Sequence, residues 1–152
     1  ADSAESLHDR LAEMGVALLV KTLDGLAENT IIPRPQVHDQ ATLAPMLKKS
    51  DGRLDWQMEA RALERRIRAL NPWPGTFTFY GKERLKILRA KVIPRPVEAA
   101  PGTVVAGFDD ELWVATGDGL LSVEMVQGAS GKRLSIGDYL RGHAMPPGTR
   151  LT

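Results

Sequence analysis

The stretch from Leu70 to Phe77 constrains the fold more than any other, because it reads Leu-Asn-Pro-Trp-Pro-Gly-Thr-Phe. Each proline fixes φ and lacks a backbone N–H, so neither can continue a helix. Gly75 allows the chain to turn, and the aromatic and β-branched residues after it are typical of a strand. The sequence therefore predicts a corner at which a helix ends and a sheet begins.

Positive charge is concentrated on both sides of this corner. The segment from Lys48 to Arg95 carries 13 Lys and Arg residues against five Asp and Glu, a balance of +8, whereas the whole chain has a net charge of +1. The other residues must then sum to −7. Such segregation favours a polyanionic partner for the central segment.

A leucine-rich segment and a proline-containing one precede the basic region. Apolar residues recur at three- and four-residue spacings from Ser3 to about Glu28, which predicts an amphipathic helix with one apolar face. These residues are Leu7, Leu11, Met14, Leu18, Leu19, Leu23 and Leu26. Residues 31–47 contain three prolines and no period, as an extended linker does. We expect a helix at 1–30, a linker at 31–47 and a domain at 48–152.

A second helix is expected between the linker and the corner. Asp55 is a candidate for its N-terminus, and Trp56, Leu63 and Ile67 would share its apolar face. Arg61, Arg65 and Arg68 project elsewhere on such a helix, where Glu64 offers ordinary surface ion pairs. We interpret Trp56 and Trp113 as packing residues. Trp73 is better explained as a plug of the corner than as a base-stacking residue.

The residues after the corner predict a small β-barrel. Five strand candidates are separated by turn sequences at hairpin spacing: Thr76–Tyr80, Arg84–Val92, Thr103–Ala106, Leu112–Thr116 and Leu120–Val126. Turns are expected at Gly81-Lys82, Asp109-Asp110 and 117–119, a loop at 128–131, and a short capped helix at 135–140. The fold class is mostly β with helices, an OB-like Greek-key barrel preceded by an amphipathic helix and an extended linker.

The second of these strands has an unusual pattern. Leu85 and Ile87 share one parity, whereas Ala90 and Val92 share the other, so the alternation slips around Leu88. A β-bulge produces this slip and bends the strand. The polar positions are all basic, which makes a phosphate-binding surface more attractive than a solvated face. The candidate nucleic-acid-binding residues are Arg61, Arg65, Arg68, Lys82, Arg84, Lys86, Arg89 and Lys91.

Other kinds of site find little support in the sequence. The chain has no cysteine, which excludes disulfides and thiolate metal sites and suits a reducing compartment. Three separate histidines give no metal-ligand spacing, and no glycine-rich phosphate loop is present. We assign no catalytic, cofactor-binding or metal-binding residue. No apolar run reaches the roughly 20 residues of a membrane span, and residues 1–5 do not read as a signal peptide, so we expect a cytoplasmic protein.

Four segments carry a family resemblance. Asp51–Trp56, Arg68–Gly75, Pro101–Val104 and the ending from Arg141 to Thr149 resemble the C-terminal part of the methionyl-tRNA formyltransferase family in order and spacing. The resemblance implies that residues 1–30 are the last helix of a catalytic domain. It also implies that the barrel holds initiator tRNA by its backbone, so that the catalytic domain can N-formylate methionyl-tRNA.

The resemblance implies the cofactor 10-formyltetrahydrofolate for the missing N-terminal domain. In this family the catalytic domain carries an Asn-His-Asp set and a Ser-Leu-Leu-Pro motif, and neither is present in this sequence. We therefore expect this chain to bind no cofactor and to be inactive alone. The alternative is a scaffolding barrel of a sugar-nucleotide or folate-dependent formyltransferase that binds no RNA. A further alternative is self-association through the apolar face of the first helix.

Overall fold

The computed structural model describes residues 2–106, 110–129 and 131–152. The chain forms two compact units, Ala1–Leu47 and Lys48–Thr152. The expected turn at Asp109-Asp110 and the expected loop at 128–131 lie partly outside the described residues. No described helix is long and apolar enough to cross a membrane.

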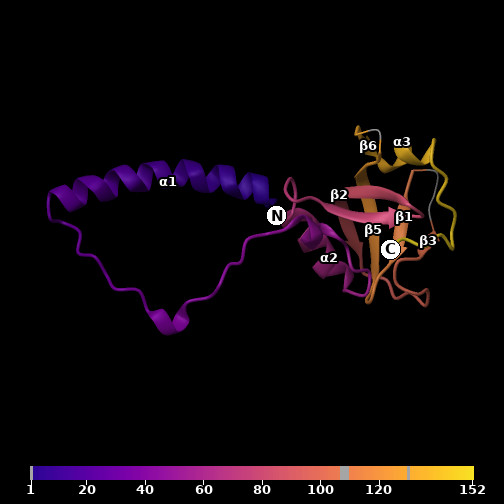
Figure 1. The fold of residues 1–152 in the computed structure, drawn as a ribbon, viewed down its shortest axis with the longest axis horizontal. Helices are drawn as coiled ribbons and strands as arrows, with labels where there is room; N and C mark the ends of the chain where they lie inside the picture. Colours follow the sequence, from indigo (N-terminus) through magenta and orange to yellow (C-terminus); the bar gives the residue numbers. More distant parts are fainter. Residues whose placement is uncertain (1, 107–109, 130) are drawn as a thin grey trace. The chain divides into compact units, whose positions relative to one another are not determined.

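The first unit consists of one long helix and an extended segment (Figure 1). Helix α1 spans Ala4–Ala27, and Ser3 caps it in a capping box with Ser6, which confirms the predicted start. Asn29 adopts a positive φ of 57° just beyond its end. The segment that follows is extended apart from a short 3-10 turn, η1, at His38–Gln40.

The apolar residues of α1 cover more than the single face that was predicted. Between residues 11 and 27, the charged residues are Glu13, Lys21 and Asp24. At a rotation of about 100° per residue, their side chains fall within an arc of roughly 80° around the helix axis. The side chains over the rest of the circumference are almost all apolar. They include Val16 and Val20, which the sequence analysis left out, and both are exposed.

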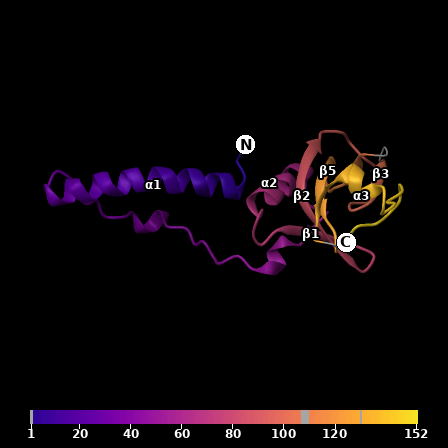
Figure 2. The same ribbon diagram turned by 90° about the horizontal axis from the view of Figure 1, so that it is seen from above.

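The second unit is a curled antiparallel sheet with short helices (Figure 2). The strand order is β1-β2-β5-β4-β3, with β6 paired to β5. The elements are η2 (Lys49–Gly52), α2 (Ala60–Ala69), β1 (Thr76–Tyr80), β2 (Glu83–Ile93), β3 (Val104–Ala106), β4 (Leu112–Ala115), β5 (Leu120–Gln127), β6 (Arg133–Ser135) and α3 (Ile136–Leu140). The predicted OB-like β fold is confirmed.

Residues 148–152 join the two edges of this sheet. Thr152 exchanges two backbone hydrogen bonds with Phe79 of β1, at 2.7 and 3.0 Å. On the other side, the backbone N–H of Val104 in β3 donates to the carbonyl of Thr149 at 2.9 Å, and that of Gly148 donates to the carbonyl of Val104 at 2.8 Å. Because the same short segment serves β1 and β3, it closes the sheet into a barrel.

One helix begins later than predicted, and one strand was missed. Helix α2 begins at Ala60 rather than near Asp55, because the Asp55 carboxylate accepts the backbone N–H of Gln57 at 3.0 Å and the Asp55 carbonyl accepts that of Met58, which forms a turn. Strand β6 was missed because its three residues are too few to show a period. The expected short helix at 135–140 is confirmed as α3, with Ser135 as its N-cap.

The tryptophans occupy different environments. Trp56 is 4% exposed, packs in the core, and donates from Nε1 to the buried hydroxyl of Thr78 at 3.0 Å. Trp73 is 55% exposed, so the expectation of a packed plug was wrong. The corner is held instead by backbone contacts, since the N–H of Gly75 donates to the carbonyl of Leu70 at 2.8 Å. The Trp73 ring is therefore left outside the core.

Candidate nucleic-acid interface

A bulge in strand β2 brings four cations to one face of the sheet. The pairing of β2 with β5 shifts register around Leu88 and Arg89, which confirms the predicted irregularity. Leu85 and Ile87 before the shift and Ala90 after it are all buried. The shift lets both parities point inward, and the outer face of β2 accordingly carries Arg84, Lys86, Arg89 and Lys91.

The strand register extends this face across the sheet. Lys86 pairs with Phe77 of β1 on one side and with Gln127 of β5 on the other, and Gln127 pairs with Arg133 of β6. Residues that are directly opposite in neighbouring strands share a face. The row therefore runs from the buried ring of Phe77 through a lysine and an amide to an arginine, and its three polar members can contact phosphate or bases.

The β1 end of this basic face is the part where β1 pairs with β2 before the bulge. There Arg84 and Arg53 lie against aromatic rings. The guanidinium carbon of Arg84 lies 3.7 Å from the centroid of the Phe77 ring, and that of Arg53 lies 5.6 Å from the centroid of Phe79. No described carboxylate forms an ion pair with Arg84, Lys86 or Arg53. Their charge is therefore available to an anionic ligand.

Arg89 and Lys91, beyond the bulge, share one carboxylate. Glu124 of β5 accepts from Arg89 Nε at 2.8 Å through one oxygen and from Lys91 Nζ through the other. One negative charge thus faces two positive ones, which leaves this end of β2 about half neutralised. Both cationic side chains are exposed, at 65% and 75%, so they can turn toward another anion.

The arginines of helix α2 form a separate group. Leu63 and Ile67 of α2 belong to the same core as Leu85 of β2, so the helix faces the inner side of the strand. The predicted ion pair from Arg68 to Glu64 is present at 2.5 Å. Arg65 donates to the backbone carbonyl of Arg61 at 3.3 Å. The structure therefore does not place these residues on the face that β2 presents.

Lys82 lies in the turn between β1 and β2, where its side chain is exposed. The turn precedes Arg84 by two residues. Lys82 is therefore close to the β1 end of the basic face along the chain, and its assignment to nucleic-acid binding stays a prediction.

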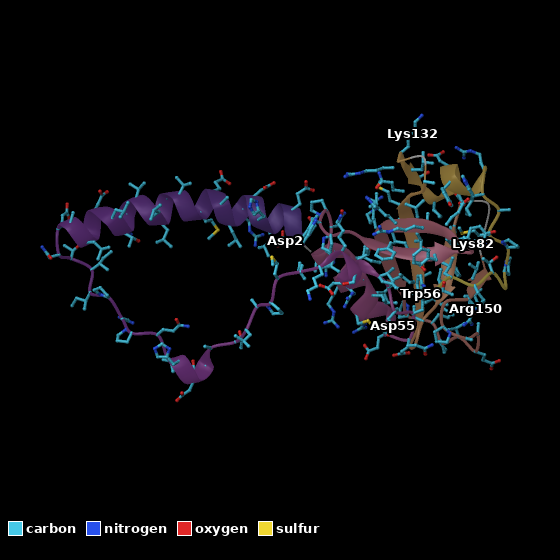
Figure 3. The ribbon with its side chains drawn as sticks, viewed as in Figure 1. Asp2, Asp55, Trp56, Lys82, Lys132 and Arg150 are labelled. Carbon is cyan, nitrogen blue, oxygen red and sulfur yellow. The ribbon has the colours of Figure 1, made fainter. Side chains whose placement is uncertain are left out.

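A hollow of about 400 Å³ adjoins the β1 end of the face. Its lining includes Arg53, Asp55, Trp56, Arg150 and Thr152. Figure 3 shows Asp55, Trp56 and Arg150 toward the same end of the barrel, opposite to Lys132. Arg150 is oriented by a hydrogen bond from its guanidinium to the hydroxyl of Thr103 at 3.0 Å. Arg53 and Arg150 thus line the same hollow.

Two shifted pKa values belong to helix α3. The hydrogen bond with Ser135 lowers the pKa of Asp138, with a further contribution from the positive charge of Arg141. Burial raises the pKa of Tyr139, and the negative charge of Glu83 adds to the shift. Both shifts follow from the capping and packing of α3, so we assign them to the fold. Among the described residues, no group of three metal-ligating side chains comes together.

Comparison with known proteins identifies the domain. The family described as "Formyl transferase, C-terminal domain" matches residues 46–144, which include α2 and all strands of the barrel. The chain belongs to this formyl transferase C-terminal domain family. The match covers β2, which carries the four cations, and the strands beside it in the sheet.

Relatives with similar sequences agree with the family assignment. The chain is 40% identical to a methionyl-tRNA formyltransferase of Heliobacterium modesticaldum over 99% of its own length and 50% of the relative. It is 42% identical to that of Chromobacterium violaceum over 99% of its length and 48% of the relative. The resemblance to the C-terminal part of methionyl-tRNA formyltransferase is thus confirmed, and the chain spans about half the length of these relatives.

Solved structures share the fold of the formyl transferase C-terminal domain. A crystal structure of a HypX variant from Aquifex aeolicus has a TM-score of 0.61 at 19% identity, over 87% of this chain and 24% of that one. HypX from the same organism in complex with tetrahydrofolic acid gives a TM-score of 0.60 at 19% identity, over 82% of this chain and 22% of that one. These matches support the arrangement of the elements.

Several residues of the domain's basic face escaped the sequence analysis. Arg53 and Phe79 meet only because the segment before α2 bridges to β1, at Arg53 and Phe77. Glu124 reaches Arg89 and Lys91 only because of the register between β2 and β5, in which Met125 pairs with Arg89 and Ser122 with Lys91. Arg150 enters through the segment that closes the barrel. Each depends on tertiary pairing, and the only sequence signal was the Asp-Gly-Arg motif around Arg53.

Proposed function

We propose that this chain is the tRNA-binding C-terminal portion of a methionyl-tRNA formyltransferase. Its barrel would hold methionyl initiator tRNA largely through backbone phosphates and present it to an N-terminal catalytic domain. The observation that carries the proposal is the bulge in β2, which gathers four cations on one outer face. Lysine and arginine side chains on such a face neutralise phosphates and release counterions.

Formyl transfer itself belongs to the rest of the protein in this proposal. The relatives are about twice as long as this chain, which leaves room for a catalytic domain that binds 10-formyltetrahydrofolate. We assign no catalytic or cofactor-binding residue to the chain, and we expect it to be inactive alone. A role in translation initiation would place the protein in the cytoplasm.

Helix α1 supports the presence of that domain as a partner. Its large apolar side chains are exposed, with Leu18 at 66% and Leu19 at 60%, although they point in different directions around the helix. A helix that is apolar over most of its circumference is stable when neighbours cover more than one side. We therefore propose that α1 is inserted into the catalytic domain rather than resting on its surface.

Salt titration of tRNA binding tests the phosphate mechanism. For about five phosphate contacts the slope of log affinity against log salt concentration should lie near −4, whatever tRNA is used. Reversal of charge in Lys86→Glu with Arg89→Glu should weaken binding to all tRNAs alike. Selective loss for one tRNA would point to base recognition instead, and absence of binding at low salt would favour the scaffolding alternative.

A further inference from the structure

Aromatic rings and arginines alternate at the β1 end of the basic face. Phe79 pairs with Arg84 across the hairpin, and Phe77 pairs with Lys86. The two rings meet edge to face with centroids 5.7 Å apart. Phe77 is 8% exposed beneath Arg84, whereas Phe79 remains partly exposed. The Phe79 ring is therefore an aromatic surface on the outside of a strand, with cations beside it.

Arg53 connects this ring to the adjoining hollow. Its guanidinium lies 5.6 Å from the Phe79 centroid, farther than the close stack of Arg84 on Phe77. The same residue lines the hollow with Arg150. Asp55 also lines it, but one oxygen of its carboxylate already accepts the N–H of Gln57. The hollow thus combines two arginines with one carboxylate that is engaged in a local turn.

Duplex and single-stranded RNA require different surfaces. Duplex RNA is bound mostly through its phosphates and 2′-hydroxyls, because its bases are stacked inside. Unpaired nucleotides stack on aromatic rings and arginine planes while their phosphates follow a positive groove. The part of β2 after the bulge offers cations and a carboxylate. The part before the bulge pairs with β1, which adds aromatic rings.

We infer that the β1 end of this face binds an unpaired nucleotide of the RNA, with its base on Phe79 and a phosphate between Arg53 and Arg150. The inference rests on the proposed function and names the kind of RNA element that this part of the site accepts. Arg84, held on Phe77, would flank the base on the side of β2. The exposed ring of Trp73 is a weaker candidate, since no cation–π contact of the described residues involves it.

Two labelled probes test the inference: a ten-nucleotide oligouridylate strand and a ten-base-pair RNA duplex, each titrated with the 152-residue chain by fluorescence anisotropy. Loss of a stacked base costs about 1 to 3 kcal/mol. Phe79→Leu should therefore weaken binding of the single strand about fivefold or more and leave duplex binding within about twofold. Phe79→Tyr, which keeps the ring, should restore single-strand binding, and thermal unfolding checks that each variant is folded.

The matched control is Lys86→Gln, which removes a charge from the neighbouring row. It should weaken both probes alike, and Arg150→Gln should reduce the salt slope of the single strand by about one. If Phe79→Leu weakens both probes equally or neither, while Lys86→Gln weakens both, the nucleotide site is wrong and the proposed function stands. If the unmodified chain binds neither these probes nor tRNA, both proposals fail.

Discussion

The two ends of strand β2 carry the same kind of charge in different surroundings. Before the bulge, Arg84 lies on the Phe77 ring and Lys86 stands between Phe77 and Gln127, without an ion pair to a described carboxylate. After it, Arg89 and Lys91 share Glu124. A count of cations therefore overstates a phosphate-binding surface, because what matters is the charge that the fold leaves uncompensated.

Charge reversal at each end should give the largest contrast. Arg84→Glu with Lys86→Glu should weaken tRNA binding about 50-fold, or about 2.3 kcal/mol, since two available cations become repulsive. Arg89→Glu with Lys91→Glu should weaken tRNA binding only about tenfold, because the negative charge of Glu124 already offsets part of their positive charge. Anisotropy titrations at fixed ionic strength measure both losses. Equal losses would show that Glu124 releases its partners when RNA binds, and the distinction between the two ends would disappear.

Removal of the shared carboxylate should have a smaller and opposite effect. Glu124→Gln frees two cations at nearly constant shape, so tRNA affinity should rise about threefold and the salt slope should steepen by about one. Glu83→Gln is the matched control, because Glu83 lies on β2 with Arg89 and Lys91 but acts electrostatically on Tyr139. An unchanged affinity for Glu124→Gln, or an equal gain for Glu83→Gln, would show that Glu124 does not specifically weaken the binding of phosphates by Arg89 and Lys91.

The free energy of unfolding should differ least between variants at the two ends of β2. Arg84→Ala removes a contact between a cation and the Phe77 ring, which contributes about 0.5 to 1 kcal/mol at an exposed site. Lys91→Ala should change the free energy of unfolding by less, because exposed ion pairs contribute little. Urea unfolding of both variants measures the difference. A larger loss for Lys91→Ala would indicate that its ion pair with Glu124 matters more to the fold than to the charge of the surface.

Local patterns were enough to predict much of this molecule. The slip in parity between Ile87 and Ala90 predicted the bulge, and with it the four cations on one face. Proline, glycine and capping residues predicted the corner and the ends of α1. These features depend on neighbours along the chain, which is why the sequence alone revealed them.

Features that depend on distant pairing could not be predicted. The position of Glu124 follows from the register of β5, and the meeting of Arg53 with Phe79 follows from a bridge between separate segments. The exposure of Trp73 was missed for a related reason, since a tryptophan between prolines packs only if the fold supplies a cavity for it. The backbone of the corner leaves its ring outside.

The short segment that joins β1 to β3 has a consequence for how the barrel assembles. Phe79 and Thr152 are far apart in the chain, so the ring of strands can be completed only after nearly the whole domain is available. Until then both outer strands present unpaired N–H and C=O groups, which invite association with other chains. Removal of these few residues would therefore harm solubility and would also remove Arg150 from the hollow beside the basic face.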